Sequence, residues 1–128
     1  MSYMMDASAV LAALFDEPGR ELVDAQLRGS QISVVNLSEV YATLLEGGMD
    51  FAEADDIIRP LPLRIRNFRD AHAWEVAKLR PLTKKFGLSL GDRACIAQAA
   101  MAELPILTAD RRMAEAQDVV GVEIRLIR

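Results

Sequence analysis

The stretch Ser2-Tyr3-Met4-Met5-Asp6-Ala7-Ser8-Ala9 has the pattern of a short buried strand that ends abruptly in an acid. An apolar helical run, Val10-Leu11-Ala12-Ala13-Leu14-Phe15, follows directly. An acid at the carboxyl end of a strand, where a helix begins, occupies the position at which open α/β sheets bind their ligands. Further acids delivered to the same edge would therefore define a site around Asp6.

The rest of the sequence alternates between short apolar runs and helical segments. The β-branched and apolar runs predict further strands at residues 31–35, 63–68, 105–108 and 119–127. Apolar spacing, caps and Gly or Pro stops predict helices at residues 7–16, 20–28, 36–46, 51–58, 71–79, 93–102 and 111–117. Strands joined through helices imply an α/β fold in one domain, residues 1–128, with a mainly parallel sheet and helices on both faces.

Two patterns predict where particular side chains lie. Arg64 and Arg66 alternate along the third strand, which is typical of a half-exposed strand near a sheet edge. Tyr41 and Trp74 fall on apolar helical stripes, so we expect both in the core and not as platforms for nucleic-acid bases.

Composition excludes several classes of protein. The net charge of −4 argues against a protein that coats nucleic acid through bulk charge, although a local basic rim stays open. No apolar run approaches the roughly 20 residues that span a bilayer, and the start lacks the pattern of a signal peptide, so we expect no membrane association. The single cysteine, Cys95, cannot form an internal disulfide, and we expect a cytoplasmic protein.

Four acids follow strands or open helices of the predicted sheet. Asp6 and Asp110 follow the first and fourth strands, Glu39 comes shortly after the second, and Asp92 opens the helix before the fourth. Each acid taken alone fits a helix cap, and Asn36-x-x-Glu39 matches a capping box. Together they would crowd one edge of the sheet and repel, unless a cation neutralised them. Mg²⁺ or Mn²⁺ suits such oxygen ligands.

The acids also lie in sequence motifs, which are Met5-Asp6-Ala7-Ser8-Ala9, Val35-Asn36-Leu37-Ser38-Glu39-Val40-Tyr41, Gly87-Leu88-Ser89-Leu90-Gly91-Asp92-Arg93-Ala94 and Leu107-Thr108-Ala109-Asp110-Arg111. In this order they resemble the motifs of PIN-domain ribonucleases, and among these the VapC toxins of toxin–antitoxin pairs. The resemblance spans almost the whole chain, but residues 48–68 carry no family motif. It implies a PIN-like three-layer α/β/α fold with strand order 3-2-1-4-5.

The resemblance also implies an activity and its residues. It implies an endoribonuclease, dependent on Mg²⁺ or Mn²⁺, that leaves 5′-phosphate and 3′-hydroxyl ends. The implied catalytic and metal-binding acids are Asp6, Glu39, Asp92 and Asp110, with Glu39 bound directly or through water. Ser8 and Thr108 match small polar positions that would orient these carboxylates, and Arg93 and Arg111 are candidates for contacts to RNA or for counter-charges. The implied partners are an RNA substrate, a VapB-like antitoxin and a second copy in a homodimer.

Two other functions stay open at this stage. One is a PIN fold kept as a catalytically silent binding module, although the complete set of acids argues against it. The other is a receiver-like phosphoacceptor domain, which has similar length and acids at strand ends. Such a domain requires adjacent acids after the first strand and an Asp after the third, whereas Asp6 has no acidic neighbour and Asn67 follows the third strand.

Overall fold

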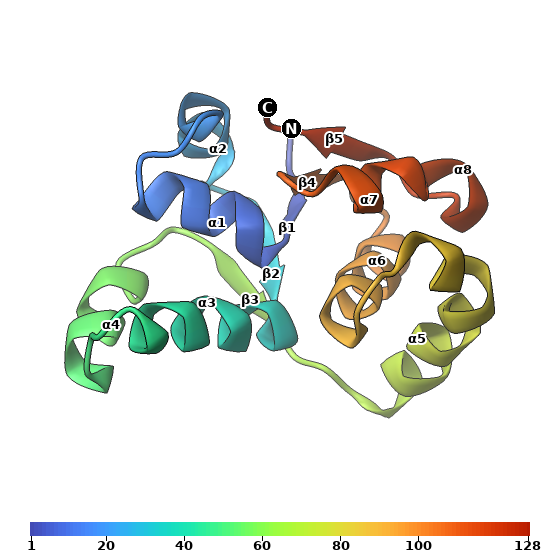
Figure 1. Cartoon of the computed structure of the whole chain (residues 1–128), viewed down its shortest axis with the longest axis horizontal. Coiled ribbons are helices and arrows are strands. Elements are labelled where there is room, and N and C mark those ends of the chain that lie inside the picture. Colours follow the sequence, from blue (N-terminus) through green and yellow to red (C-terminus); the bar gives the residue numbers. More distant parts are fainter.

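One five-stranded sheet organises the computed structural model, which describes all residues from 1 to 128 (Figure 1). The strands are β1 (Met4–Met5), β2 (Gln31–Ser33), β3 (Arg64–Arg66), β4 (Ile106–Thr108) and β5 (Ile124–Leu126). Every neighbouring pair is parallel, and the order is β3-β2-β1-β4-β5. The predicted α/β fold and its strand order are confirmed, and β3 lies at the edge that its alternating arginines predicted.

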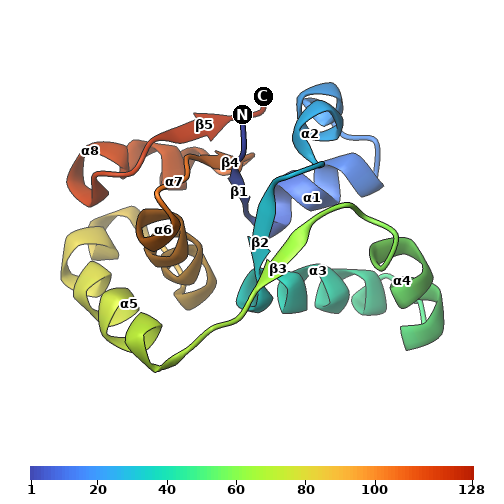
Figure 2. The ribbon, with the colours of Figure 1, turned by 180° about the vertical axis from the view of Figure 1, so that it is seen from behind.

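Helices cover both faces of this sheet. They are α1 (Ala7–Leu14), α2 (Arg20–Gln26), α3 (Val34–Glu46), α4 (Phe51–Ile58), α5 (Asp70–Thr83), the 3₁₀ helix η1 (Lys84–Phe86), α6 (Leu90–Ala102), α7 (Arg111–Glu115) and α8 (Gln117–Val120). Helices α1 to α4 lie on one side of the sheet and α5 to α8 on the other (Figures 1 and 2). None of these helices combines the length and apolar character that a bilayer span requires.

The sheet's apolar side chains form the centre of two cores. Met5, Ile32 and Leu107 belong to the core beneath α1–α4, whereas Met4 and Ile106 belong to the core beneath α6 and α7. Side chains of a strand alternate between the two faces, so consecutive apolar residues serve both cores. This explains why β1, at the centre of the sheet, is apolar at both of its positions.

Two predicted strands are shorter than expected because the residues at one end of each are helical. Residues 34 and 35 are helical, since the Ser33 hydroxyl accepts a hydrogen bond from the Val35 amide (3.2 Å) and caps α3 before Asn36. Asn36 therefore lies inside the helix, and the predicted cap at this residue is wrong. Residues 119 and 120 belong to α8, which ends at Gly121 with φ +71°, so the last strand starts only at Ile124.

Helix α5 also departs from its prediction. Asp70 is its first helical residue and not its cap, and the helix continues through Pro81 to Thr83. The Trp74 side chain is 66% exposed, so its expected place in the core is wrong. Helical spacing placed Trp74 on an apolar stripe, but no other element covers that part of α5.

Candidate active site

Asp6 is the buried centre of the site. It follows β1 directly and caps α1, where its Oδ1 accepts a hydrogen bond from the Ala9 amide (3.0 Å). The residue is only 5% exposed. Burial raises the pKa of Asp6 to about 6, the nearby negative charge of Asp92 adds to the rise, and hydrogen bonds from Thr108, Ser8 and Ala9 oppose it. The fold therefore holds a carboxylate where its charge is costly.

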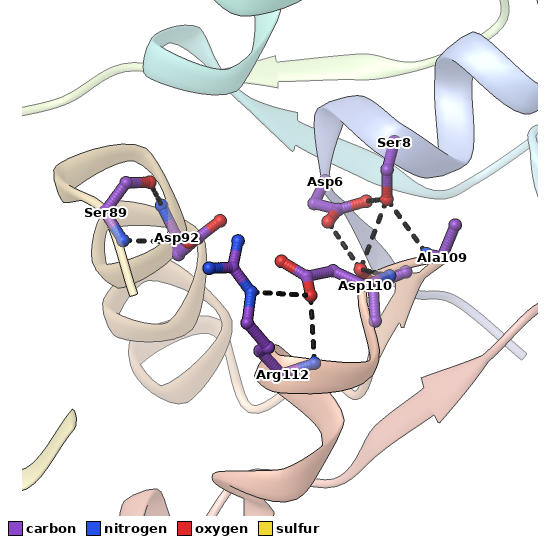
Figure 3. A network of polar contacts seen from close by, with 8 residues as sticks. Asp6, Ser8, Ser89, Asp92, Ala109, Asp110 and Arg112 are labelled. Carbon is purple, nitrogen blue, oxygen red and sulfur yellow. Dashed lines mark hydrogen bonds and ion pairs between the residues drawn. The ribbon is translucent and has the colours of Figure 1, made fainter. Parts of the chain in front are cut away.

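Two hydroxyl groups tie Asp6 to the neighbouring strand. The Ser8 hydroxyl donates to Asp6 Oδ1 (2.7 Å) and the Thr108 hydroxyl donates to Asp6 Oδ2 (2.5 Å). Thr108 Oγ1 in turn accepts from the Asp110 amide, and Ser8 Oγ accepts from the Ala109 amide, both at 2.9 Å. Figure 3 shows this network joining the start of α1 to the loop before α7. The orienting contacts expected of Ser8 and Thr108 are present at Asp6.

Asp92 and Asp110 hold the first turns of two other helices. Asp92 Oδ2 accepts a hydrogen bond from the Ser89 amide (2.9 Å), and the Asp92 amide donates to Ser89 Oγ (3.2 Å), which completes a capping box on α6. Asp110 caps α7 through Oδ1, which accepts from the Arg112 amide (2.9 Å). In each carboxylate the other oxygen has no hydrogen-bond partner, so capping leaves one oxygen of each acid available to a ligand.

Arg112 lies beside Asp110, and its side chain extends toward Asp92. Its Nε is 3.7 Å from Asp110 Oδ1, and in Figure 3 its guanidinium group lies between the carboxylates of Asp92 and Asp110. Gly87 lies beside the same guanidinium, since a Cβ on Gly87 would stand 3.4 Å from Arg112 Nη1, an ordinary contact distance. Arg112 is therefore a counter-charge of the site, although its sequence context resembles an ordinary charged surface.

Glu39 reaches the site through a contact between α3 and α6. The Asn36 side-chain amide donates to Glu39 Oε1 (2.8 Å) and to the Gly91 carbonyl (3.0 Å), and Asn36 is 1% exposed. The Glu39 carboxylate lies against Gly91 so closely that an added Cβ would collide with Glu39 Oε2. The absence of a side chain at Gly91 therefore leaves the space that the Glu39 carboxylate occupies.

The Cys95 thiol is buried near three of the four acids. Burial raises the pKa of Cys95 well above its usual value, and the negative charges of Asp6, Asp92 and Glu39 raise it further. These acids come from the start of α1, from α6 and from α3, so three elements direct negative charge at one buried point.

The carboxylates fit a hard divalent cation by chemistry but do not form a ready-made cluster. They are oxygen ligands of the kind that Mg²⁺ and Mn²⁺ prefer. No three His, Cys, Asp or Glu side chains stand close enough together to hold a metal ion. The sequence predicted that the four acids crowd one edge of the sheet around a cation, and the structure does not show such a cluster. Capping bonds and the Arg112 ion pair hold Asp92 and Asp110 as they stand.

The two arginines predicted beside the acids take different places. Arg93 turns toward α5, where its Nη1 donates to the Val76 carbonyl (3.3 Å). Arg111 is exposed at the start of α7 and forms no ion pair.

Asn36, Gly91 and Arg112 were missed as site residues. Asn36 and Gly91 lie within the PIN-like motifs, yet nothing in the sequence shows that they meet across two helices. The signal for Arg112 was its position two residues after Asp110.

A family model for the PIN domain matches residues 3–119. The chain therefore belongs to the PIN domain family. PIN nucleases generally use divalent metal ions, and PIN toxins of toxin–antitoxin pairs are generally nucleases. No curated protein sequence matches the chain significantly.

Solved structures with the same fold include several toxin–antitoxin complexes. DNA-bound VapBC from Salmonella typhimurium matches with a TM-score of 0.76 and 16% identity, over 100% of this chain and 99% of that chain. VapBC2 from Rickettsia felis, bound to a promoter DNA fragment, matches with a TM-score of 0.74 and 16% identity over 98% of both chains. VapBC-5 from Mycobacterium tuberculosis matches with a TM-score of 0.63 and 19% identity, over 99% of this chain and 98% of that chain. At these identities the likeness establishes a shared fold.

Proposed function

We propose that this PIN domain, residues 1–128, is a metal-dependent endoribonuclease and the VapC-type toxin of a toxin–antitoxin pair. The observation that carries the proposal is the buried Asp6 carboxylate, held by Ser8, Thr108 and the start of α1. A buried acid with a raised pKa is costly to a fold, and such groups concentrate at functional sites. A divalent cation would offset that cost.

In the proposed reaction the acids hold the ion and the water. Asp6, Asp92 and Asp110 would bind Mg²⁺ or Mn²⁺, and Glu39 would bind it directly or through water. The bound ion supplies a lowered pKa for the attacking water and charge stabilisation for the phosphate oxygens. Glu39 keeps Oε2 free while Asn36 holds Oε1, so Glu39 can orient the water. The water oxygen bonds to phosphorus, the bond to the 3′ oxygen breaks, and that oxygen leaves with a proton.

RNA cleavage by the purified chain tests the proposal. Labelled RNA should be cut with Mg²⁺ or Mn²⁺ and left intact in EDTA, and the products should carry 5′-phosphate and 3′-hydroxyl ends. Asp6→Asn should abolish cleavage, whereas Asp56→Asn, a matched change on the exposed face of α4, should not. Cleavage that persists in EDTA, or in the Asp6→Asn variant, would refute the metal-dependent mechanism.

The proposed antitoxin partner has a surface to bind. An apolar groove of about 270 Å³ lies between α1, α3, α4 and β3 and is lined by Val10, Ile32, Leu37, Tyr41, Asp55, Ile58, Arg59, Leu61, Leu63 and Ile65. Basic residues of such a partner would complement the site's acids. Coexpression with the product of a neighbouring small reading frame should yield an inactive complex.

The proposed homodimer and the proposed cytoplasmic location stay predictions. Light scattering of the purified chain measures its mass in solution and so tests the homodimer.

One observation favours the silent binding module. No three acids stand close enough to share an ion, which suits a fold that has kept its acids only as helix caps. Titration with millimolar Mn²⁺ decides between the two functions, because the silent module would bind no Mn²⁺ at the site.

The receiver-like alternative is wrong, since receiver domains of the flavodoxin-like class have strand order 2-1-3-4-5 and this sheet has 3-2-1-4-5.

A further inference from the structure

A polar cleft, separate from the apolar groove, lies between the edge strand β3 and the start of α5. It has a volume of about 320 Å³, several times that of a water molecule, and is lined by Arg64, Ile65, Arg66, Asn67, Arg69 and His72. We refer to these six residues as the basic cleft. Three arginines and no acid line it, in a chain whose net charge is −4.

The cations of the basic cleft are unpaired. The guanidinium groups of Arg64, Arg66 and Arg69 form no ion pair, whereas Arg20, Arg59 and Arg128 each lie within 4 Å of a carboxylate. Charged residues on an edge strand also discourage pairing with other chains, which would explain the two arginines of β3. That role does not explain Arg69, which follows the strand and lines the same cleft.

The wall of the basic cleft is held in place. His72 Nδ1 accepts a hydrogen bond from the Arg69 amide (2.7 Å), and the His72 ring stacks on Phe68 with centroids 5.4 Å apart. Because Nδ1 is an acceptor here, Nε2 carries the proton and is a donor. The Gln98 amide of α6 donates to the Asn67 carbonyl (2.9 Å) and fixes the loop. These contacts fix the backbone at Asn67 and Arg69 and leave the His72 Nε2 donor beside the three arginines.

Strand register relates the basic cleft to the candidate active site. On β2, Ile32 pairs with Met5 of β1, so the next residue, Ser33, lies level with Asp6. Ser33 also pairs with Arg66 of β3. Arg66 and Asp6 therefore lie level at the carboxyl ends of two strands that are separated by β2. Neighbouring strands are about 4.8 Å apart, which separates the two backbones by roughly 10 Å. That span is about three steps of a stacked strand, at roughly 3.4 Å per nucleotide.

We propose that the basic cleft binds the phosphodiester backbone of the RNA substrate a few nucleotides from the bond that is cut. The proposal rests on the function proposed above. Arginine suits phosphate because its planar fork donates two parallel hydrogen bonds. A negatively charged protein needs such a local positive surface to hold a polyanion. A second copy of the chain fits less well, since symmetric pairing across β3 would bring the arginines of both copies together.

RNA binding without cleavage tests this proposal. The probe is a fluorescein-labelled single-stranded RNA of mixed sequence, measured by anisotropy in EDTA at several salt concentrations. The Arg64→Ala/Arg66→Ala/Arg69→Ala variant should bind about tenfold more weakly. Its log–log salt slope should fall by about 2, because each phosphate that is no longer neutralised lowers the slope by roughly 0.7. The control variant Arg20→Ala/Arg59→Ala/Arg128→Ala makes the same change in net charge and should keep the wild-type slope.

Further variants separate folding and assembly from binding. Arg64→Lys/Arg66→Lys/Arg69→Lys keeps the charge and should keep most of the salt slope, and Arg69→Ala alone leaves β3 intact. Equal affinity and slope for the alanine variant and its control would overturn the proposal, as would a changed oligomeric state with unchanged RNA affinity. Cleavage by wild type in Mn²⁺ is scored separately. If RNA binding depends on the basic cleft but wild type cuts no RNA, the proposed nuclease activity is wrong. If the alanine variant cuts RNA with an unchanged KM, the proposed role of the basic cleft is wrong.

Discussion

The free-energy cost of burying Asp6 predicts how the Asp6→Asn variant behaves. The pKa of Asp6 is about 6 in the folded protein against an ordinary value of 3.8. At 1.36 kcal/mol per pKa unit the difference amounts to about 3 kcal/mol. An amide carries no charge to bury, and its oxygen can still accept from Ser8 and Ala9. The hydrogen bond from Thr108 already lowers this pKa, so the difference of about 3 kcal/mol includes it. The metal-free variant should therefore be about 3 kcal/mol more stable at pH 7.5.

The sign of the pH dependence follows from linkage. Because the pKa is raised on folding, the folded protein holds the proton more tightly than the unfolded chain. The stabilising contribution of protonated Asp6 is complete below pH 3.8 and is lost as the pH rises through about 6. The stability difference between Asp6→Asn and wild type should therefore grow by about 3 kcal/mol between pH 3.5 and 7.5.

Urea unfolding at a series of pH values, in EDTA, measures this difference. Thr108→Val supplies a second perturbation of the same carboxyl: it removes a hydrogen bond that lowers the Asp6 pKa, so the pKa should rise further. In a parallel series, Mg²⁺ at ten times its Kd should stabilise wild type by about 1.4 kcal/mol and the Asp6→Asn variant by much less. A difference between variant and wild type that is constant across the pH range would refute the reasoning.

Three further predictions concern other parts of the site. Gly91→Ala should keep the fold but displace Glu39 and reduce RNA cleavage roughly tenfold to a hundredfold, with no further loss in a Glu39→Ala background. Arg112→Ala should free Asp110 and tighten Mn²⁺ binding, measured by calorimetry, by about twofold to fivefold, as expected for a part-exposed ion pair; weaker binding would contradict this. Cys95, buried and with a raised pKa, should react with a thiol reagent only as the protein unfolds, so rapid labelling of the folded protein would show that the site opens.

Local sequence patterns predicted the fold more completely than they predicted the site. A helical run that stops before Pro60-Leu61-Pro62 predicted residues 51–58 as a helix, and the structure has α4 at Phe51–Ile58. Val119 and Val120 have strand propensity, but helix α8 includes both. The capping hydroxyl of Ser33 similarly overrides the strand propensity of Val34 and Val35. In these places one local pattern competed with another of similar strength.

The site depended on contacts between distant residues, which local patterns do not encode. The hydrogen bond from Asn36 to the Gly91 carbonyl joins residues 55 positions apart. The place of the Glu39 carboxylate likewise depends on Gly91, which lies on a different helix. Three of the four acids, Asp6, Asp92 and Asp110, also have a local role at the start of a helix, which marked them in the sequence. Residues with only a long-range role were missed.

The shortness of β1 has a consequence for how this protein tolerates change. Met4 and Met5 are fully buried, and the very next residue is Asp6. Longer strands place several residues between a core and the functional edge of a sheet, and those residues absorb small shifts in packing. Here no such buffer exists, so repacking Met5 moves the Asp6 backbone directly. Substitutions selected for a better core should therefore often alter the site, and stability and activity will be hard to engineer independently.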